Sequence, residues 1–328
     1  MTELAVPFAA QRQQARRRAA WRRRRLVLLL MSPWLVGFSV FFGYPLVMSV
    51  YLSFTHYDLL SSPKWIGLAN YKYLFQSDPQ VGPAVKNTLW LIAIMVPLQV
   101  LFAFGIGLML ARAKRGVGFF RTVFYLPALA PPVAATMAFV YLLNPATGPL
   151  NVILGHLGID GPLWFQSPEW SKPSLTLLSI WGVGNLMIIF LAAILDAPRQ
   201  LYESAELDGA GPLQRLRWVT LPTISPVILF AIVISVIAAL QYFTQAYVAA
   251  NIAAGQASQA GDQTVNNLGY PEASTLFYPV LLYQHGFKFF NMGYASALSV
   301  LLLVVAFTIT VLIIRNSRRW VHYAGTGR

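Results

Sequence analysis

The chain has 328 residues, of which 57% are hydrophobic and only 11% are charged, and its formal net charge is +13. Soluble domains carry about 25% charged residues, so this composition excludes an ordinary water-soluble surface and favours a protein embedded in lipid. The chain has no cysteine, which excludes disulfides, thiolate metal sites and cysteine nucleophiles.

Six apolar runs are long enough to cross a bilayer as helices, which requires about 20 residues each. They cover residues 26–51, 88–111, 122–143, 174–195, 224–246 and 294–314. Several contain prolines or polar residues, which spans tolerate where a neighbouring helix or a watery cavity satisfies the freed backbone groups. The pattern predicts an all-α, polytopic membrane protein with six transmembrane helices between residues 26 and 315.

Lysines and arginines are distributed unequally between the flanks of these runs. Nineteen of them, all but one arginines, lie in the tail 1–25, in the segments after the second, fourth and sixth runs, and in the tail 316–328. Five, all lysines, lie in the segments 52–87, 144–173 and 247–293. Since positive residues are enriched in cytoplasmic flanks, we expect both termini to be cytoplasmic and these three segments to lie outside. The expected location is a bacterial inner membrane, crossed several times.

The arginine-rich tail directly precedes an apolar run, so we interpret it as a topology anchor that contacts anionic lipid, and expect no nucleic-acid partner. A cleaved signal peptide is the alternative. The first run is too long for a signal-peptide core and no small-residue cleavage site follows promptly, which favours an uncleaved span. In the third outer segment, the small and polar residues of 253–269 predict a flexible excursion.

Motifs for catalysis and cofactor binding are missing from the sequence. It contains no phosphate-binding GxxxxGK[ST] loop and no close histidine pair, because His56, His156, His285 and His322 are scattered. We therefore expect no catalytic residue, no metal and no cofactor. The runs hold almost no ionisable residues, which disfavours both an autonomous secondary carrier and a membrane-embedded enzyme.

The acidic passage LYESAELDGAG (201–211) interrupts the apolar pattern. We expect Asp196 to cap a helix over 198–207, with Arg199 balancing Glu203 and an apolar side that includes Leu201 and Ala205. Gly209 and Gly211 should end this helix, and Pro212 should start a second one with Leu213, Leu216 and Val219 on one side. The elbow of about 25 residues has too little local protein to bury both apolar sides, which favours a partner with a groove. An ordinary solvated loop is the alternative.

The segment ESAELDGAGPLQRLRWVTLP (203–222) resembles the EAA loop of the membrane subunits of ATP-binding-cassette importers. The matching residues are Glu203, Ala205, Asp208, Gly209, Ala210, Leu221 and Pro222, whereas Ser204 replaces an alanine and Leu216 replaces the usual phenylalanine. The segments 65–75, 119–159 and 293–305 resemble the carbohydrate permeases of this class, which include the maltose-transporter subunits. Their G-G-P segment after the fifth span is not found here.

The resemblance implies a sugar importer permease subunit, itself not an enzyme, that forms half of the translocation pathway. It implies a second related permease, two copies of a cytosolic ATPase and an extracytoplasmic sugar-binding protein. The EAA loop, 197–222, would couple to the ATPase. The coupling residues would be Glu203, Ala205, Asp208, Gly209, Ala210, Leu213 and Leu216. Import of glycerol phosphate or another polyol is the alternative, but a phosphate would favour cations inside the spans, and none is present.

Sites for sugars combine amides, hydroxyls and aromatic rings. In the fifth run, Ser235, Tyr242 and Gln245 share one helix face and Gln241 lies beside it, whereas Trp181 and Asn185 are one turn apart in the fourth. We expect these six residues to line the solute pathway. The alternatives are that the polar side chains hydrogen-bond between helices and that the second permease carries the whole site.

Overall fold

The computed structural model describes residues 6–259 and 269–322. Nearly all of the regular structure is helical, as predicted. Within the described part, the sheet content is one hairpin of two-residue strands, β1 (Thr55–His56) and β2 (Lys64–Trp65).

Three continuous helical segments are long and apolar enough to cross a membrane, namely Ala20–Leu52, Val81–Arg112 and Met292–Ser317. The first two contain π-helical turns, so that each is built from several elements. These elements are α1 (Val6–Phe38), η1 (Ser39–Gly43) and α2 (Tyr44–Leu52), then α4 (Val81–Trp90), η2 (Leu91–Met95) and α5 (Val96–Arg112). The third segment is the single helix α17 (Met292–Ser317).

Three further apolar segments are bent pairs, in which the helix is interrupted part-way along the predicted span. If each bent pair counts as one span, the described chain has up to six spans. The pairs are Val117–Leu129 with Pro132–Leu142, bent by 99°, Pro168–Trp181 with Gly184–Asp196, bent by 49°, and Pro212–Thr223 with Ser225–Leu240, bent by 68°. Their elements are α6 (Val117–Tyr125), η3 (Leu126–Leu129), α7 (Pro132–Leu142), α9 (Pro168–Trp181), α10 (Gly184–Asp196), α12 (Pro212–Arg215), η5 (Leu216–Thr220), α13 (Leu221–Thr223) and α14 (Ser225–Leu240).

The 99° bend has a local cause. Pro131 and Pro132 have no backbone N–H, so the helical ladder cannot continue through them from η3 into α7. The predicted fifth span was expected to reach residue 246, but α14 ends at Leu240 and a separate helix, α15 (Thr244–Gln259), follows after a short break. The stretch 253–259 is therefore helical, which corrects the expected flexible excursion, and residues 260–268 lie outside the described part.

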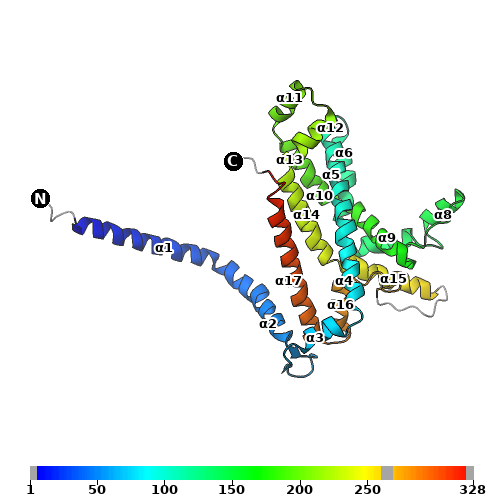
Figure 1. Cartoon of the computed structure of the whole chain (residues 1–328), viewed down its shortest axis with the longest axis horizontal. Helices are drawn as coiled ribbons and strands as arrows, with labels where there is room; N and C mark the ends of the chain where they lie inside the picture. The colour runs from blue at the N-terminus through cyan, green and yellow to red at the C-terminus, as the bar shows by residue number, and fades with distance from the viewer. Residues whose placement is uncertain (1–5, 260–268, 323–328) are drawn as a thin grey trace.

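The three segments 52–87, 144–173 and 247–293, which were expected to lie outside, contain further helices. They hold the hairpin and the short elements α3 (Ala69–Gln76), α8 (Pro149–His156), η4 (Trp164–Gln166), α16 (Tyr278–Tyr283) and η6 (Gln284–Lys288). Figure 1 shows the helices α5, α10, α14 and α17 running between two ends, with α11 (Arg199–Leu207) and α12 at one end and α3 at the other. We call these the elbow end and the hairpin end.

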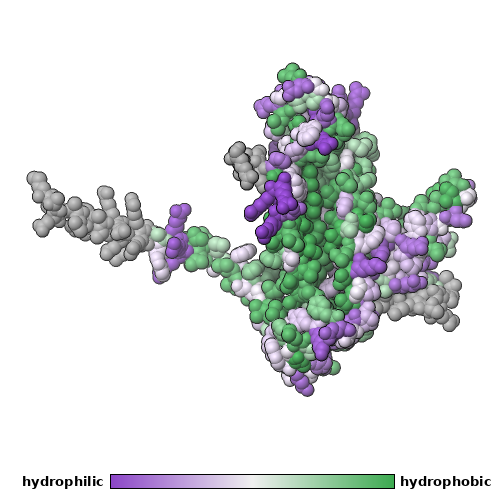
Figure 2. Space-filling model, in the orientation of Figure 1, coloured by the Kyte–Doolittle hydropathy of each residue, from purple (hydrophilic) through white to green (hydrophobic). Residues whose placement is uncertain are grey.

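Hydrophobic side chains form a band along the long helices, between more hydrophilic elbow and hairpin ends (Figure 2). This distribution is the one that a bilayer requires. The α1 part of the first span projects away from the bundle (Figure 1), whereas α2 contacts α17, and no residue of Ala20–Leu52 is buried.

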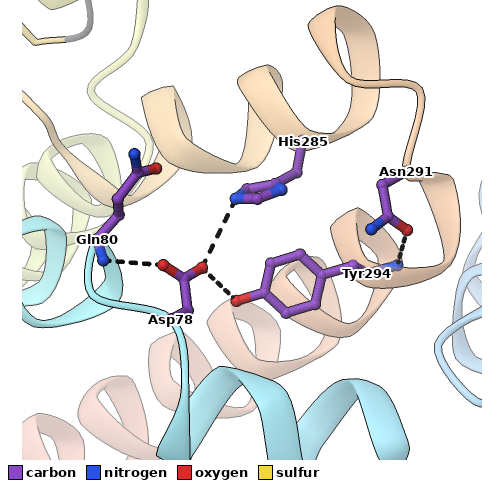
Figure 3. Close-up of polar contacts among 5 residues, drawn as sticks. All are labelled: Asp78, Gln80, His285, Asn291 and Tyr294. Atoms are coloured by element: carbon purple, nitrogen blue, oxygen red, sulfur yellow. Dashed lines mark hydrogen bonds and ion pairs between the residues drawn. The ribbon is translucent and has the colours of Figure 1, made fainter.

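A polar cluster joins three segments at the hairpin end (Figure 3). One carboxylate oxygen of Asp78 accepts a hydrogen bond of 2.6 Å from the Tyr294 hydroxyl, and the other accepts one of 2.8 Å from the Gln80 backbone N–H. His285 Nε2 lies 3.6 Å from the same carboxylate. Burial lowers the pKa of His285, although Asp78 opposes the shift. The cluster therefore fixes the segment between α3 and α4 against η6 and α17.

Close packing of α10 against α6 and η3 depends on Gly184. A Cβ atom at this position would lie 2.8 Å from both the Phe124 carbonyl oxygen and the Tyr125 Cα. Backbone atoms cannot move aside as a flexible side chain can, so Gly184→Ala should overpack the site and cost about 1–3 kcal/mol. We expect the melting temperature of the purified protein to fall by several degrees.

Gly255→Ala is the matched control, because a Cβ on that helical residue of α15 would meet nothing within 4 Å. This variant should melt at or slightly above the temperature of the unmodified protein. Equal melting temperatures for the two variants would contradict the packing account.

Candidate functional site

A cavity of about 450 Å³ lies where three helices are interrupted. The interruptions are those between η3 and α7, between α9 and α10, and between α14 and α15. The cavity is lined by Met95, Gln99, Pro127, Ala128, Ala130, Pro132, Ala135, Leu178, Ser179, Trp181, Gly182, Ala238, Gln241, Tyr242 and Gln245. In membrane proteins, broken helices are tolerated where they line a water-filled cavity, and such breaks often form substrate sites.

The polar groups of this cavity are amides and hydroxyls. The Ser179 hydroxyl lies 3.2 Å from the Tyr242 hydroxyl, and Gln99 Nε2 donates a hydrogen bond of 3.3 Å to the Ser179 carbonyl oxygen. The side-chain amides of Gln241 and Gln245 hydrogen-bond to no residue of the described chain, which leaves them available to a solute. No acidic residue, lysine, arginine or histidine lines the cavity.

Aromatic rings complete the cavity wall. Trp181 is 42% exposed and its ring packs against Phe139, with 5.3 Å between the ring centroids. The indole thus offers an apolar face beside the amides. This combination suits a solute with hydroxyl groups and apolar C–H faces.

The second candidate site is the elbow of α11, α12, η5 and α13. Helix α11 ends through Gly209, whose φ of +76° is readily adopted only by glycine. The Ala210 backbone N–H then donates to the Ala205 carbonyl at 2.9 Å, and Gly209 N–H donates to the Glu206 carbonyl at 3.0 Å. These bonds satisfy carbonyls that the helix end would leave unpaired, so the chain reverses sharply here.

The elbow resumes at α12, where the Gly211 backbone N–H donates to Gln214 Oε1 at 2.8 Å. The Tyr202 hydroxyl donates to Thr220 Oγ1 at 3.1 Å, which fixes α11 against η5. Two leucines of the elbow are nevertheless not covered by other residues: Leu207 is 89% exposed and Leu213 is 77% exposed. The elbow is therefore a rigid reversal with an uncovered apolar tip.

Two details of the predicted elbow are wrong. Asp196 is the last residue of α10, while Pro198 occupies the N-cap of α11 with no side-chain capping bond, so Asp196 does not act as the cap. The ion pair joins Glu206 to Arg215 across the reversal at 3.1 Å, in place of the expected balance of Glu203 by Arg199. The reversal brings Arg215 back over α11, which spacing along a single helix could not indicate.

Comparison with known proteins settles the family. A family model described as "Binding-protein-dependent transport system inner membrane component" matches residues 103–322. The chain is 37% identical over 294 residues to the probable ABC transporter permease protein YesP of Bacillus subtilis (strain 168), which covers 89% of this chain and 90% of that protein. The chain belongs to this family of inner membrane components.

Two further similarities extend over most of the permease. It is 30% identical over 292 residues to the sulfoquinovosyl glycerol transport system permease protein SmoG of Agrobacterium fabrum (strain C58 / ATCC 33970), covering 88% of this chain and 89% of that protein. In a crystal structure of a bacterial ABC transporter involved in the import of the acidic polysaccharide alginate, one chain matches with a TM-score of 0.70 and 26% identity. That match covers 93% of this chain and 99% of the other.

The predicted pathway residues of the permease fall into two groups. Trp181, Gln241, Tyr242 and Gln245 line one cavity together. Ser235 is buried in α14 and Asn185 is exposed on α10, and neither lines the cavity. The break at Gly182 explains the error for Asn185, because it places Trp181 and Asn185 on two different helices.

Sequence reasoning missed Gln99 and Ser179 of the cavity and Leu207 and Trp218 of the elbow. Gln99, a polar residue two positions after Pro97 in an apolar run, could have been included on the same grounds as Gln241. Trp218 is 69% exposed in a π-helical turn, which shifts it relative to the face expected for a regular helix.

The predicted coupling residues of the elbow differ in exposure. Leu213 is exposed, whereas Leu216, Ala205 and Ala210 are partly covered. Glu203, Asp208 and Gly209 are exposed. The region thus presents carboxylates and leucines together at its outer surface. No group of three or more His, Cys, Asp or Glu residues that could hold a metal is present in the described residues.

The natural absence of cysteine permits a direct test of the cavity. Gln241→Cys should react rapidly with a small, charged, membrane-impermeant thiol reagent, because Gln241 is exposed to a polar cavity. Ser235→Cys is the control, six residues earlier, and it should react at least tenfold more slowly because Ser235 is only 4% exposed. Labelling rates followed by mass spectrometry check this, and comparable rates at the two positions would rule out the cavity as described.

Proposed function

We propose that this inner membrane component is the permease subunit of an ATP-driven sugar importer and forms half of its translocation pathway. The observation that carries the proposal is the elbow, whose exposed leucines require a partner, in a chain of this family. The partner for the elbow is a cytosolic ATPase, present in two copies, whose ATP-driven movement is transmitted through Glu203, Ala205, Asp208, Gly209, Ala210, Leu213 and Leu216. The permease itself requires no cofactor.

The proposed topology places residues 1–25 and 316–328 in the cytoplasm of a bacterial cell, with the six-span domain 26–315 between them. The elbow within 197–222 lies on the cytoplasmic side, and the segments 52–87, 144–173 and 247–293 lie outside. The excess of arginine in the first group of segments supports this orientation. A sugar-binding protein delivers the solute to the outer side.

A second, related permease completes the pathway. The first span supports this partner, because none of the residues in Ala20–Leu52 is buried by the chain itself. The cavity is likewise open at one side in the isolated subunit, as the exposure of Trp181 and Gln241 indicates.

The cavity supports a neutral solute. Amides, hydroxyls and an indole face line it, and it contains no cation to neutralise a phosphate or carboxylate. The alginate importer handles, by its description, an acidic polysaccharide, so we propose that this subunit differs from that neighbour in the charge of its solute. The same lack of cations disfavours glycerol phosphate.

Leu213→Asp tests the coupling role. Leu213 is 77% exposed, so the folded subunit should lose less than about 0.5 kcal/mol of stability. Burial of a carboxylate in the groove of an ATPase should instead weaken docking, and ATP-driven uptake should fall more than tenfold. The measurements are co-purification of the ATPase subunits and uptake by the assembled transporter in vesicles.

Leu60→Asp is the matched control, because Leu60 is a 95% exposed leucine in an outer segment. This variant should retain the ATPase and take up solute at the unmodified rate. Normal uptake and normal ATPase retention in Leu213→Asp would eliminate the proposed coupling surface.

A further inference from the structure

A second cavity, of about 550 Å³, lies at the elbow end between the ends of α5 and α10 and the elbow. Small-molecule sites have volumes of about 300–1,000 Å³, so it is large enough for a ligand. It is lined by Leu108, Ala111, Arg112, Ile194, Leu195, Ala197, Arg199, Tyr202, Pro212, Arg215 and Thr220. None of these residues contributes to the solute cavity described above.

The charged residues that line this cavity are all cationic. Three arginines line it and no acidic residue does, although the chain's densest acidic cluster lies in the adjoining helix α11. Arg215 is paired with Glu206 at 3.1 Å. Arg112 and Arg199 form no ion pair with any residue of the described chain, so two guanidinium groups are left for an external anion.

Most of the other residues that line the cavity are apolar. Leu108 on α5 and Ile194 and Leu195 on α10 lie in the last turns of the hydrophobic band, and Leu195 is 56% exposed. Arg112 is the last residue of α5, so the cationic rim lies where the band meets the hydrophilic elbow end (Figure 2). A ligand that fits both parts has an anionic head and a hydrocarbon tail.

We propose that this cavity binds an anionic phospholipid, with its phosphate between Arg112 and Arg199 and its acyl chain along Leu108, Ile194 and Leu195. Basic pockets between helices at the cytoplasmic face of a membrane bind phospholipid headgroups by the same physical principle. Arginine suits this role because its planar guanidinium can bind phosphate oxygens in a bidentate manner. The proposal rests on the cytoplasmic orientation given above, since anionic lipids are enriched in that leaflet.

The position of the lipid has a mechanical consequence. Arg112 belongs to the bundle, whereas Arg199 opens α11 of the elbow, so one phosphate would bridge the two parts. The Tyr202–Thr220 hydrogen bond already joins two residues that line this cavity. A ligand that binds only the folded arrangement stabilises it, and an anionic lipid should therefore stiffen the joint between elbow and bundle.

Native mass spectrometry of the assembled transporter in a neutral detergent tests the proposal, with phosphatidylglycerol and phosphatidylcholine of identical acyl chains as probes. We expect the unmodified transporter to bind phosphatidylglycerol in preference to phosphatidylcholine. The double variant Arg112→Gln/Arg199→Gln should bind phosphatidylglycerol about 30-fold more weakly, because each cation near the headgroup contributes about a factor of five. Arg121→Gln, an exposed cation of α6 outside the cavity, should bind as the unmodified protein does.

A charge-retaining variant protects the test against misfolding. Arg112→Lys/Arg199→Lys should keep most of the preference for phosphatidylglycerol, and both double variants should still assemble with the ATPase. Equal binding of the two lipids, or an unchanged affinity in the glutamine double variant, would overturn the proposal. Displacement of phosphatidylglycerol by millimolar inorganic phosphate would also overturn it, because the ligand would then be a free anion. Lipid binding is read without sugar or uptake, so its failure is distinct from a failure of the transport proposal.

Discussion

Hydrocarbon offers no hydrogen-bond partners, so the backbone of a membrane-spanning chain must remain helical unless protein or water satisfies it. The rest of this structure depends on that constraint. Three of the breaks in continuous helix lie around one place, where η3 and α7, α9 and α10, and α14 and α15 are separated. The same place holds the uncharged cavity with its free amides. The breaks and the cavity are therefore linked, because a polar cavity makes the breaks tolerable and the breaks supply part of its polar lining.

The elbow, at the hydrophilic end, has a hydrogen-bonded backbone but an uncovered apolar surface. Its backbone is closed by the turn at Gly209 and by the Gln214 and Tyr202 hydrogen bonds, so it can move as one piece. Its apolar surface is left open at Leu207 and Leu213. In the proposed function, such a rigid element with an exposed apolar surface transmits the movement of the ATPase that covers it. In the proposed lipid binding, an anionic lipid in the arginine-lined cavity stiffens the joint between elbow and bundle.

The sequence predicts the apolar runs and the turn residues well, but it predicts the breaks within the helices poorly. The apolar runs, the short elbow helices and the glycine reversal all follow from local propensity, and four of the six expected pathway residues meet in one cavity. Pro131 and Pro132 account for a break before α7, but no local signal in the sequence gives the size of that bend, 99°, or the end of α14 at Leu240. Asn185 was misplaced because hydropathy continues smoothly through the break at Gly182. Arg215 was not paired with Glu206 because their contact exists only after the chain reverses.

The central claim is that the cavity at the helix breaks is the solute pathway of an ATP-driven importer. Its most direct test is ATP-dependent sugar uptake by the fully assembled transporter in vesicles, comparing the unmodified chain with Gln241→Trp. The added indole should fill much of the 450 Å³ cavity at an exposed position. We expect uptake to be abolished while the ATPase subunits remain bound. Uptake at the unmodified rate would contradict the account.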